Sequence, residues 1–344
     1  MIQFDGFLPF FGVIEGINDP EQLGRVQVRC YGFHTENKSF IPTDMLRWFS
    51  CVVSNSAGVS GIGQSPTGYV KGSTVFGYFL NREMQDGIII GSITGKPTEQ
   101  AIRNLGFNDP DGVYPIHIDE SDVNRLARNE NIDETIVQKK KDSVRTDVET
   151  TSGSWSEPET PYNTEYPHNK VSESTSGHIH EVDDTEGSER LHTYHKSGSF
   201  WEIHPEGSQV VKIVKDGYTI VSGDNFVCIE GDVSKYIGGN DNLVVKGNQD
   251  AAVDGTRTHD VEGKDTLRAP QIQLGEDDAV EPSVLGDQLA KWIETELVPW
   301  LNQHQHIGNL GYPTSAPPLA PTGPFEPGEG AKGGGVYSKV NTNQ

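Results

Sequence analysis

The stretch that decides the fold runs from Ile229 to Gly263 and reads IEGDVSKYIGGNDNLVVKGNQDAAVDGTRTHDVEG. Glycines recur every eight residues through this stretch and one step before it: Gly223, Gly231, Gly239, Gly247, Gly255 and Gly263. A β-branched residue stands two positions before each of them: Val221, Ile229, Ile237, Val245, Val253 and Val261. A fixed period held over six repeats indicates a repeat architecture rather than a low-complexity patch.

Each octad has room for one strand of about five residues and one sharp corner. Glycine suits such a corner because it tolerates positive φ. Residues that favour tight turns follow four of the six glycines: Asp224, Asp232, Asn240 and Asn248. Because β-branched residues pack well on a pleated face, we expect the Val or Ile of each octad to point inward.

The short length of the repeat predicts an oligomer. A triangular prism needs three faces per coil, so six octads in one chain would complete only two coils, which is marginal for a solenoid. Three chains that supply one face each would close the prism without free lateral edges. Residues 221–268 therefore predict an intertwined, trimeric β-helix. The alternative is a calcium-binding nonapeptide β-roll, but its GGxGxD pattern and its period do not match this repeat.

Residues 1–97 predict a separate β domain. Five short runs rich in Val, Ile, Phe and Tyr lie between turn residues: Phe10–Ile17, Gly24–Tyr31, Phe49–Ser54, Ser73–Leu80 and Gly87–Ile93. Residues 25–29 alternate between polar and apolar, as a half-buried strand does. No helical period interrupts the five runs, so a five-stranded barrel of the OB type fits them.

The remaining segments complete a mainly β fold. Residues 98–170 are charged and polar and predict a linker or strap. Residues 171–270 return to β patterning and predict the β-helix spike, with the octads at 221–268. Residues 271–344 contain one amphipathic helix over Ser283–Leu301, which Pro299 should kink or end, and a Gly- and Pro-rich tail.

The composition excludes several classes of partner. The formal net charge of −23 repels nucleic acid and anionic membranes, so we expect neither as a partner. Cys30, Cys51 and Cys228 form no CxxC pair, which indicates buried free thiols formed in a reducing cytoplasm. The apolar opening of the chain lacks a basic region and carries Asp5, so we do not interpret it as a signal peptide.

Three groups of motifs point in one direction. They are the VxGxxxxx octads; LGRVQVRCYG followed by Trp48, the loop Gly58–Gly63, Val75–Leu80 and Gly91–Gly95; and the lead-in SGHIHEVDDTEGSERLHTYHKSGSFWEIHPEGS. Together they resemble the T4-type phage baseplate central spike family and its VgrG relatives in type VI secretion. The resemblance covers well over half of the chain. It implies an OB domain followed by a triple-stranded β-helix.

The resemblance also implies a function and a setting. The protein would be the structural central spike of a contractile-tail baseplate, which punctures the host cell envelope during infection. It would be a homotrimer that binds the baseplate hub through its OB domains and carries a PAAR-like protein at its tip. It would assemble in the host cytoplasm and end in the virion. A spike of a type VI secretion system or of a phage-derived bacteriocin is the alternative within this class.

Enzymatic activity is the alternative from another class, because the T4-type protein carries a lysozyme domain between its OB domain and its β-helix. Residues 98–170 are polar and only about half as long as a lysozyme-like domain requires. Acidic pairs such as Glu130 and Asp133 lack the rigid cleft of a glycosidase. No nucleophile with its base, P-loop or Rossmann motif is present. We therefore expect no catalysis, and the net charge also disfavours an OB-fold oligonucleotide binder.

Two HxH pairs raise the question of a metal site. In extended backbone, His304 and His306 would share a face. Three chains would then offer six imidazoles, a set suited to iron or nickel on the three-fold axis, and the resemblance includes such iron sites at some spike tips. The alternative is a pair of exposed histidines at a helix end. A second group lies in the lead-in, where we favour polar decoration of a half-exposed sheet: His178, His180, His192, His195 and His204.

Overall fold

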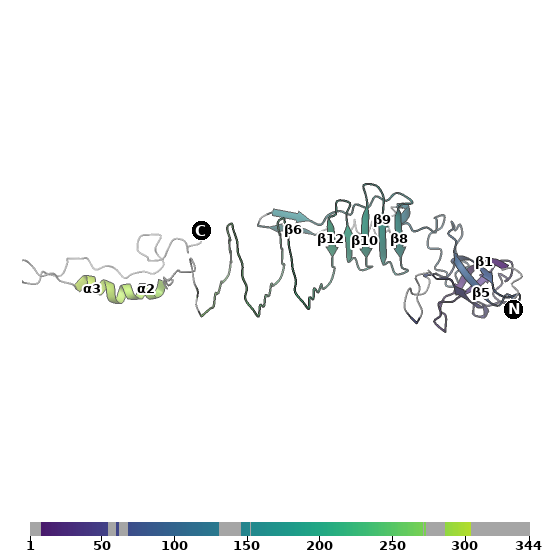
Figure 1. Cartoon of the computed structure of the whole chain (residues 1–344), viewed down its shortest axis with the longest axis horizontal. Helices are drawn as coiled ribbons and strands as arrows, with labels where there is room; N and C mark the ends of the chain where they lie inside the picture. Colours follow the sequence, from purple (N-terminus) through teal and green to yellow (C-terminus); the bar gives the residue numbers. More distant parts are fainter. Residues whose placement is uncertain are drawn as a thin grey trace, which may run out of the picture. The chain divides into compact units, whose positions relative to one another are not determined.

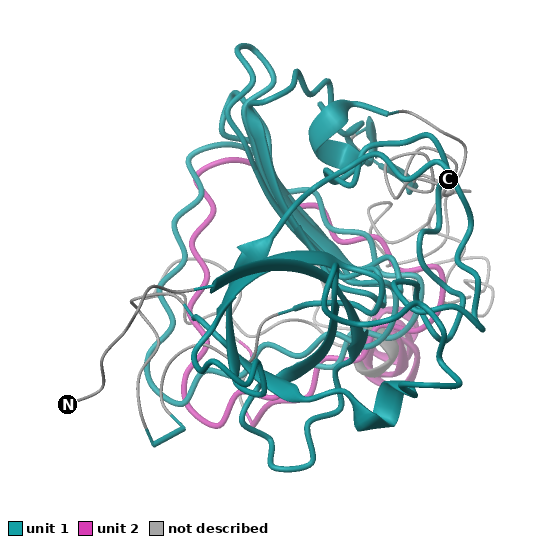
Figure 2. Cartoon of the chain, turned by 90° about the vertical axis from the view of Figure 1, so that its right-hand side faces the viewer, with its two compact units in different colours: residues 1–243 teal, residues 244–344 magenta. Residues whose placement is uncertain are grey.

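The structure is a computed structural model of the 344-residue chain (Figure 1). It describes residues 8–53, 60–61, 68–130, 146–151, 153–270, 272 and 286–303. The chain divides into two compact units, residues 1–243 and residues 244–344, which are teal and magenta in Figure 2.

Five strands of the first unit close into a barrel in the order β1–β2–β3–β5–β4, and Figure 2 shows them curving around one another. Their bounds are β1 Leu8–Gly16, β2 Val26–Cys30, β3 Trp48–Cys51, β4 Thr74–Phe79 and β5 Gly87–Ser92. The neighbours are antiparallel except β3 and β5, which are parallel. All five strands coincide with predicted runs, so the prediction of a five-stranded OB-type barrel is confirmed.

The inward positions of these strands fill the barrel. The buried side chains are Phe10, Ile14, Val26, Val28, Cys30, Phe49, Val75, Phe79 and Ile89. The ring of Phe10 lies 4.8 Å from that of Phe79 and 5.4 Å from that of Phe49, so aromatic contacts add to the burial. Gly77 permits this packing, because a Cβ there would lie 2.3 Å from the carbonyl oxygen of Ile88.

Cys30 belongs to this core, and burial raises the pKa of its thiol to about 12. At pH 8 we expect iodoacetamide to leave Cys30 unmodified until denaturant is added, because the reactive thiolate is then scarce and shielded. Mass spectrometry of the alkylated peptides checks this expectation, and modification of Cys30 in the folded protein would contradict it. Cys228 lies in the repeat segment, residues 213–270, which we call the octad run. Its thiol is exposed in the single chain, which departs from the expectation of buried thiols.

The outer face of β2 is buried as well, which corrects the expectation of a half-buried strand. All five residues of β2 are buried, including the polar Gln27 and Arg29. The chain that follows β2 lies across this face: Gln27 Nε2 donates to the carbonyl oxygen of Leu46 at 2.8 Å, and Arg29 Nη2 donates to that of Ile41 at 2.8 Å. The alternation of polar and apolar residues therefore predicts which side chains share a face of the strand, but not whether other parts of the chain bury that face.

The first unit also contains a five-stranded antiparallel sheet in the order β12–β11–β10–β9–β8, which we call the meander, and a hairpin of β6 and β7. The bounds of these elements and of two 3₁₀ turns are η1 Thr43–Met45, η2 Leu126–Arg128, β6 Asp147–Thr150, β7 Gly153–Ser156, β8 Asn169–Glu173, β9 Ile179–Asp183, β10 Arg190–Tyr194, β11 Phe200–Ile203 and β12 Gln209–Lys212. Burial alternates along β9 and β10, as expected for strands with one covered face. Residues 157–166, which we call the strap, and η2 cover that face.

The octad run follows the meander without regular secondary structure of its own. Its backbone bends once every eight residues, at 214–215, 222–223, 230–231, 238–239, 246–247, 254–255 and 262–263. Six of these bends end on a repeat glycine, and the first ends on Lys215. The period therefore begins one step before Gly223. In Figure 1 the trace of residues 213–243 runs in extended passes that reverse at sharp corners.

The repeat glycines do not use the left-handed backbone region, so positive φ does not explain them. A Cβ built on any of the six would meet nothing within 4 Å in the single chain. The single chain therefore supplies neither a conformational nor a steric reason for glycine at these corners.

The described part of the second unit contains one helix, which confirms the predicted short C-terminal helix. It consists of α2 (Gly286–Trp292), the π-helical turn η3 (Ile293–Leu297) and α3 (Val298–Gln303). Pro299 does not end this helix, because the helical backbone continues beyond it. The π turn η3 ends two residues before this proline, where a widened helix can accommodate the missing amide hydrogen. Among the described residues, no helix is long and apolar enough to cross a membrane.

Candidate functional site

The octad run presents a periodic apolar stripe. Its six β-branched residues are 39–57% exposed: Val221, Ile229, Ile237, Val245, Val253 and Val261. The other large apolar residues between 215 and 270 are 63–90% exposed. The residues of the repeat are thus the more shielded positions of an otherwise open segment. Apolar residues at this density on a surface mark a face that another molecule covers.

The main chain of the octad run (residues 213–270) forms no hydrogen-bonded ladder in the described chain, and Val214 donates its amide to Ser199 Oγ at 3.2 Å. No backbone–backbone hydrogen bond joins two described residues of the range 213–270. The polar contacts of this range involve side chains, such as the ion pair of Lys235 and Asp241 at 2.9 Å and the contact of His259 with Asp265 at 3.6 Å. Each pair spans one corner at the same position of the octad. Backbone amides and carbonyls require partners, and extended chain obtains them from a neighbouring strand.

The meander carries a second apolar surface on the side away from the strap. We call this surface the apolar face; its residues are Val182, Leu191, Trp201, Ile203 and Val211. Leu191 lies directly opposite Val182 on one neighbouring strand and Ile203 on the other. Trp201 lies opposite Val211, which is 58% exposed. The apolar residues therefore form contiguous rows, in which Leu191 and Val211 are exposed and Val182, Trp201 and Ile203 are partly exposed.

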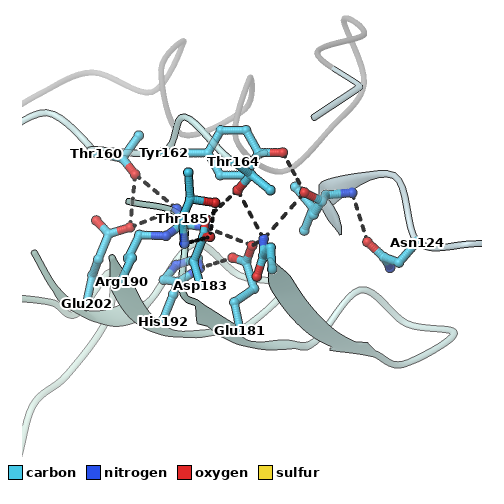
Figure 3. Close-up of polar contacts among 12 residues, drawn as sticks. Asn124, Thr160, Tyr162, Thr164, Glu181, Asp183, Thr185, Arg190, His192 and Glu202 are labelled. Carbon is cyan, nitrogen blue, oxygen red and sulfur yellow. Dashed lines mark hydrogen bonds and ion pairs between the residues drawn. The ribbon is translucent and has the colours of Figure 1, made fainter. Parts of the chain in front are cut away.

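The covered side of the meander holds a polar network (Figure 3) and, beside it, a small apolar cluster of Leu126, Tyr162, Ile179 and Tyr194. Arg190 Nη2 lies 2.7 Å from Glu181 Oε1 with both side chains unexposed, and Arg190 Nη1 lies 3.3 Å from Glu202 Oε1. His192 Nδ1 lies 2.6 Å from Glu181 Oε2. Burial works to raise the pKa of Glu181, but the hydrogen bond with His192 and the charge of Arg190 lower it below its ordinary value. Buried charges are stable only when they are paired in this way.

The strap completes this network from above, as Figure 3 shows. Thr160 Oγ1 donates to Glu202 Oε1 at 2.9 Å. Thr164 Oγ1 donates to Asp183 Oδ2. The strap is therefore held to the sheet by hydrogen bonds to carboxylates, which are stronger than bonds between neutral groups.

Tyr162 and Asn169 connect the network to η2. The hydroxyl of Tyr162 donates to the carbonyl oxygen of Leu126 at 2.7 Å, and its ring centroid lies 4.8 Å from the guanidinium of Arg190. Asn169 Nδ2 donates to Glu181 Oε1 at 2.9 Å. Burial raises the pKa of Tyr162 to about 12, and the carboxylate of Glu181 acts in the same direction. The network thus fixes three segments, η2, the strap and the meander, to one another.

A second buried ion pair lies on the outer face of the barrel. Glu15 of β1 and Arg29 of β2 are both unexposed, and Arg29 Nε lies 2.6 Å from Glu15 Oε1. Glu15 also accepts hydrogen bonds from Thr43 Oγ1 at 2.8 Å and from the amide of Phe107 at 2.9 Å. Arg29 Nη1 donates to the carbonyl oxygen of Thr35 at 2.7 Å. The pair therefore holds the loop between β2 and β3, and the chain near residue 107, against the barrel.

The barrel and the chain packed on it resemble a known protein family. The family model described as the Gp5 N-terminal OB domain matches residues 32–172. Over these residues the chain is similar to a Gp5 N-terminal OB domain. The match begins after β2 and continues through residues 98–130 into β8. The predicted boundary of the Gp5 OB domain at residue 97 stays a prediction.

Two curated relatives extend the similarity beyond the Gp5 OB domain. Protein Gp5 of Vibrio phage KVP40 is 39% identical over 253 residues, which are 63% of this chain and 60% of that protein. The pre-baseplate central spike protein Gp5 of Enterobacteria phage T4 is 43% identical over 112 residues, which are 31% of this chain and 20% of that protein. The chain therefore spans less than two thirds of the length of either relative. The resemblance to baseplate central spike proteins is confirmed.

The histidines of the meander region differ in their burial. His192 and His204 are buried in the polar network, so the interpretation as surface decoration is wrong for these two, because the strap covers their face. The rings of His178 and His195 lie 4.5 Å apart. The amide of Ser197 donates to His195 Nδ1 at 3.1 Å, which leaves the proton of the neutral ring on Nε2 and disfavours a metal there.

The structure describes one of the two HxH pairs, His178 and His180, but not the other. His180 lies beside His178 in sequence but on the exposed face of β9, where its Nδ1 is 3.2 Å from Thr193 Oγ1. In the part of the chain that the structure describes, no three His, Cys, Asp or Glu side chains gather as metal ligands would. His304 and His306 lie outside the described residues, so the metal site expected there stays a prediction.

The sequence analysis did not single out the paired charges of the Gp5 OB domain and the meander. The signal that could have found the second set is a polar residue at alternate positions of three consecutive strands: Glu181, Asp183, Arg190, His192, Glu202 and His204. Opposite charges at such positions come into register when the strands form a meander. The pair of Glu15 and Arg29 had no comparable signal, because its cover comes from loops.

Proposed function

We propose that the protein is the trimeric central spike of a phage tail baseplate and has a mechanical, non-enzymatic role in penetrating the host envelope. The Gp5 OB domain and the relatives named as central spike proteins support the class. The observation that carries the proposal is the octad run: its main chain has no ladder of its own, and its apolar stripe is open. Two further chains would supply both missing partners.

The trimer accounts for features that a single chain leaves unexplained. Covering a half-exposed valine or isoleucine contributes on the order of 1 kcal/mol, and three chains bring six such residues each. The glycines acquire a reason, because neighbouring chains would occupy the open space beside each corner. The apolar face of the meander continues into the same stripe through Ile213, which stands eight residues before Val221. One inner surface would therefore run from the meander through the octads.

The barrel would bind the baseplate hub. Its loop between β2 and β3 presents Phe40 and Met45 as largely exposed side chains. The buried pair of Glu15 and Arg29 fixes that loop, so the apolar contact would be preorganised. A PAAR-like protein at the tip, and an iron or other transition metal held by His304 and His306 on the three-fold axis, complete the proposal. In this role the protein would reside in the virion tail after assembly in the host cytoplasm.

Native mass spectrometry tests the oligomer directly. The expected species has about three times the 37.7 kDa mass of the chain. A stable monomer at micromolar concentration would remove the foundation of the proposal. Lysis of peptidoglycan by the purified protein would contradict the non-enzymatic role, even if the trimer were found.

A further inference from the structure

Three carboxyl groups beneath the strap act as hydrogen-bond acceptors. They are Glu181, Asp183 and Glu202, all buried, and each accepts at least two hydrogen bonds. Glu181 Oε1, for example, accepts from Arg190 Nη2 at 2.7 Å and from Asn169 Nδ2 at 2.9 Å. A protonated carboxyl would bring a donor of its own to positions that donors already occupy.

The fixed charges of the network do not balance. Among the described groups of the network, three buried carboxylates face one guanidinium, that of Arg190. His192 is fully buried and can supply a further positive charge, since its Nδ1 lies 2.6 Å from Glu181 Oε2. His204 lies at the rim with its Nε2 3.3 Å from Glu202 Oε2. A buried negative charge without a counter-charge is unfavourable, so the closed network favours the imidazolium form of His192.

We propose that the strap is a clasp whose closure over the meander requires a proton on His192. With this proton, both ring nitrogens of His192 are donors and the charge beside Glu181 is paired. Without it, Glu181 keeps the neutral hydrogen bond from Asn169 and shares the charge of Arg190 with Glu202, and the carboxylates repel one another beneath the strap. The strap then opens and lets water reach them. Thr160, Tyr162 and Thr164 leave the sheet together, and the link between Tyr162 and Leu126 of η2 is broken.

The groups around His192 set the direction of the pH dependence. The charged or titratable groups that face it from its own strand, the neighbouring strands and the strap are Glu181, Asp183, Arg190, Tyr194, Glu202, His204 and Tyr162, with the pair of Glu157 and Lys212 at the rim. A histidine that gains an anionic partner stabilises the closed state below the ordinary histidine pKa of about 6.5, and this stabilisation is lost as the pH rises. Glu181, whose pKa is lowered, acts in the opposite direction and fails only in acid.

Cleavage by chymotrypsin after Tyr162 reports the opening of the clasp in the full-length protein. Tyr162 is buried, so the bond to Asn163 should be cut only when the strap lifts. Dividing each rate by that of a free peptide with the sequence of residues 157–168 removes the pH dependence of the protease. We expect the normalised rate to rise about tenfold or more between pH 6.5 and pH 9. A flat profile would overturn the proposal.

Three variants distinguish an effect of the proton on His192 from a general loss of folding. His192→Gln should be cut rapidly at every pH, because glutamine cannot supply the charge. Glu181→Gln should be cut slowly at every pH, because a neutral side chain at this position no longer requires the proton. The control His195→Asn removes an exposed imidazole just beyond β10, and asparagine can still accept a hydrogen bond from the amide of Ser197. Its cleavage rates should match those of the wild type at every pH. An unchanged pH rise in His192→Gln or in Glu181→Gln would contradict the clasp.

Discussion

Val245→Asp is expected to abolish the trimer. Val245 belongs to the periodic stripe, and a carboxylate there would be buried against two copies of itself in the proposed prism. The three like charges would also repel one another at one level. We expect native mass spectrometry to detect monomer, and circular dichroism to detect less β-structure than in the wild type.

The neighbouring valine provides a matched control for this change. Val244 is 85% exposed, against 45% for Val245, and it points to the other side of the extended chain. Val244→Asp introduces the same side chain one position away and should leave the trimer intact. Equal disruption by both variants would show that any charge in the run is harmful and would contradict an inner and an outer face.

Arg29→Met is expected to lower the free energy of unfolding of the barrel by about 3–5 kcal/mol. The change leaves Glu15 buried beside two remaining donors, Thr43 and Phe107, without its counter-charge. The loop between β2 and β3 also loses its bonds to the guanidinium. Urea denaturation followed by the fluorescence of Trp48, which lies on β3, measures the effect.

The double variant Glu15→Gln/Arg29→Met distinguishes a lost pair from an unpaired charge. Removing both charges should restore part of the stability, because replacing a buried pair costs less than breaking it. A double variant as unstable as Arg29→Met alone would assign the loss to the packing of the arginine stem. Recovery would assign it to the uncompensated carboxylate of Glu15.

The local order of the chain could be predicted from the sequence because each element follows a short period. The five barrel strands come from alternating apolar runs, and residues such as Phe10, Val28 and Ile89 fill the core that those runs define. The octad period also fixes where the backbone bends. These features depend on residues that lie close together in the sequence.

The cover of each face could not be predicted in the same way. Arg29 reads as a surface residue on its strand, but a loop and the chain near Phe107 bury it. Glu181 and Arg190 likewise read as the polar side of a sheet, until the strap places them inside. The sequence period identifies the two sides of a strand, whereas long-range contacts decide which side meets water.

The absence of main-chain hydrogen bonds within residues 213–270 has a consequence for how the protein is made. In the proposed trimer, such a segment has no native state as a monomer, so its folding and its association are one event and depend on protomer concentration. Before they associate, newly made chains would expose the apolar stripe. In this period they would be most susceptible to proteases and to aggregation. Once closed, the prism would come apart only if a whole series of levels separated together, and its lifetime would be set by a rate rather than by an equilibrium.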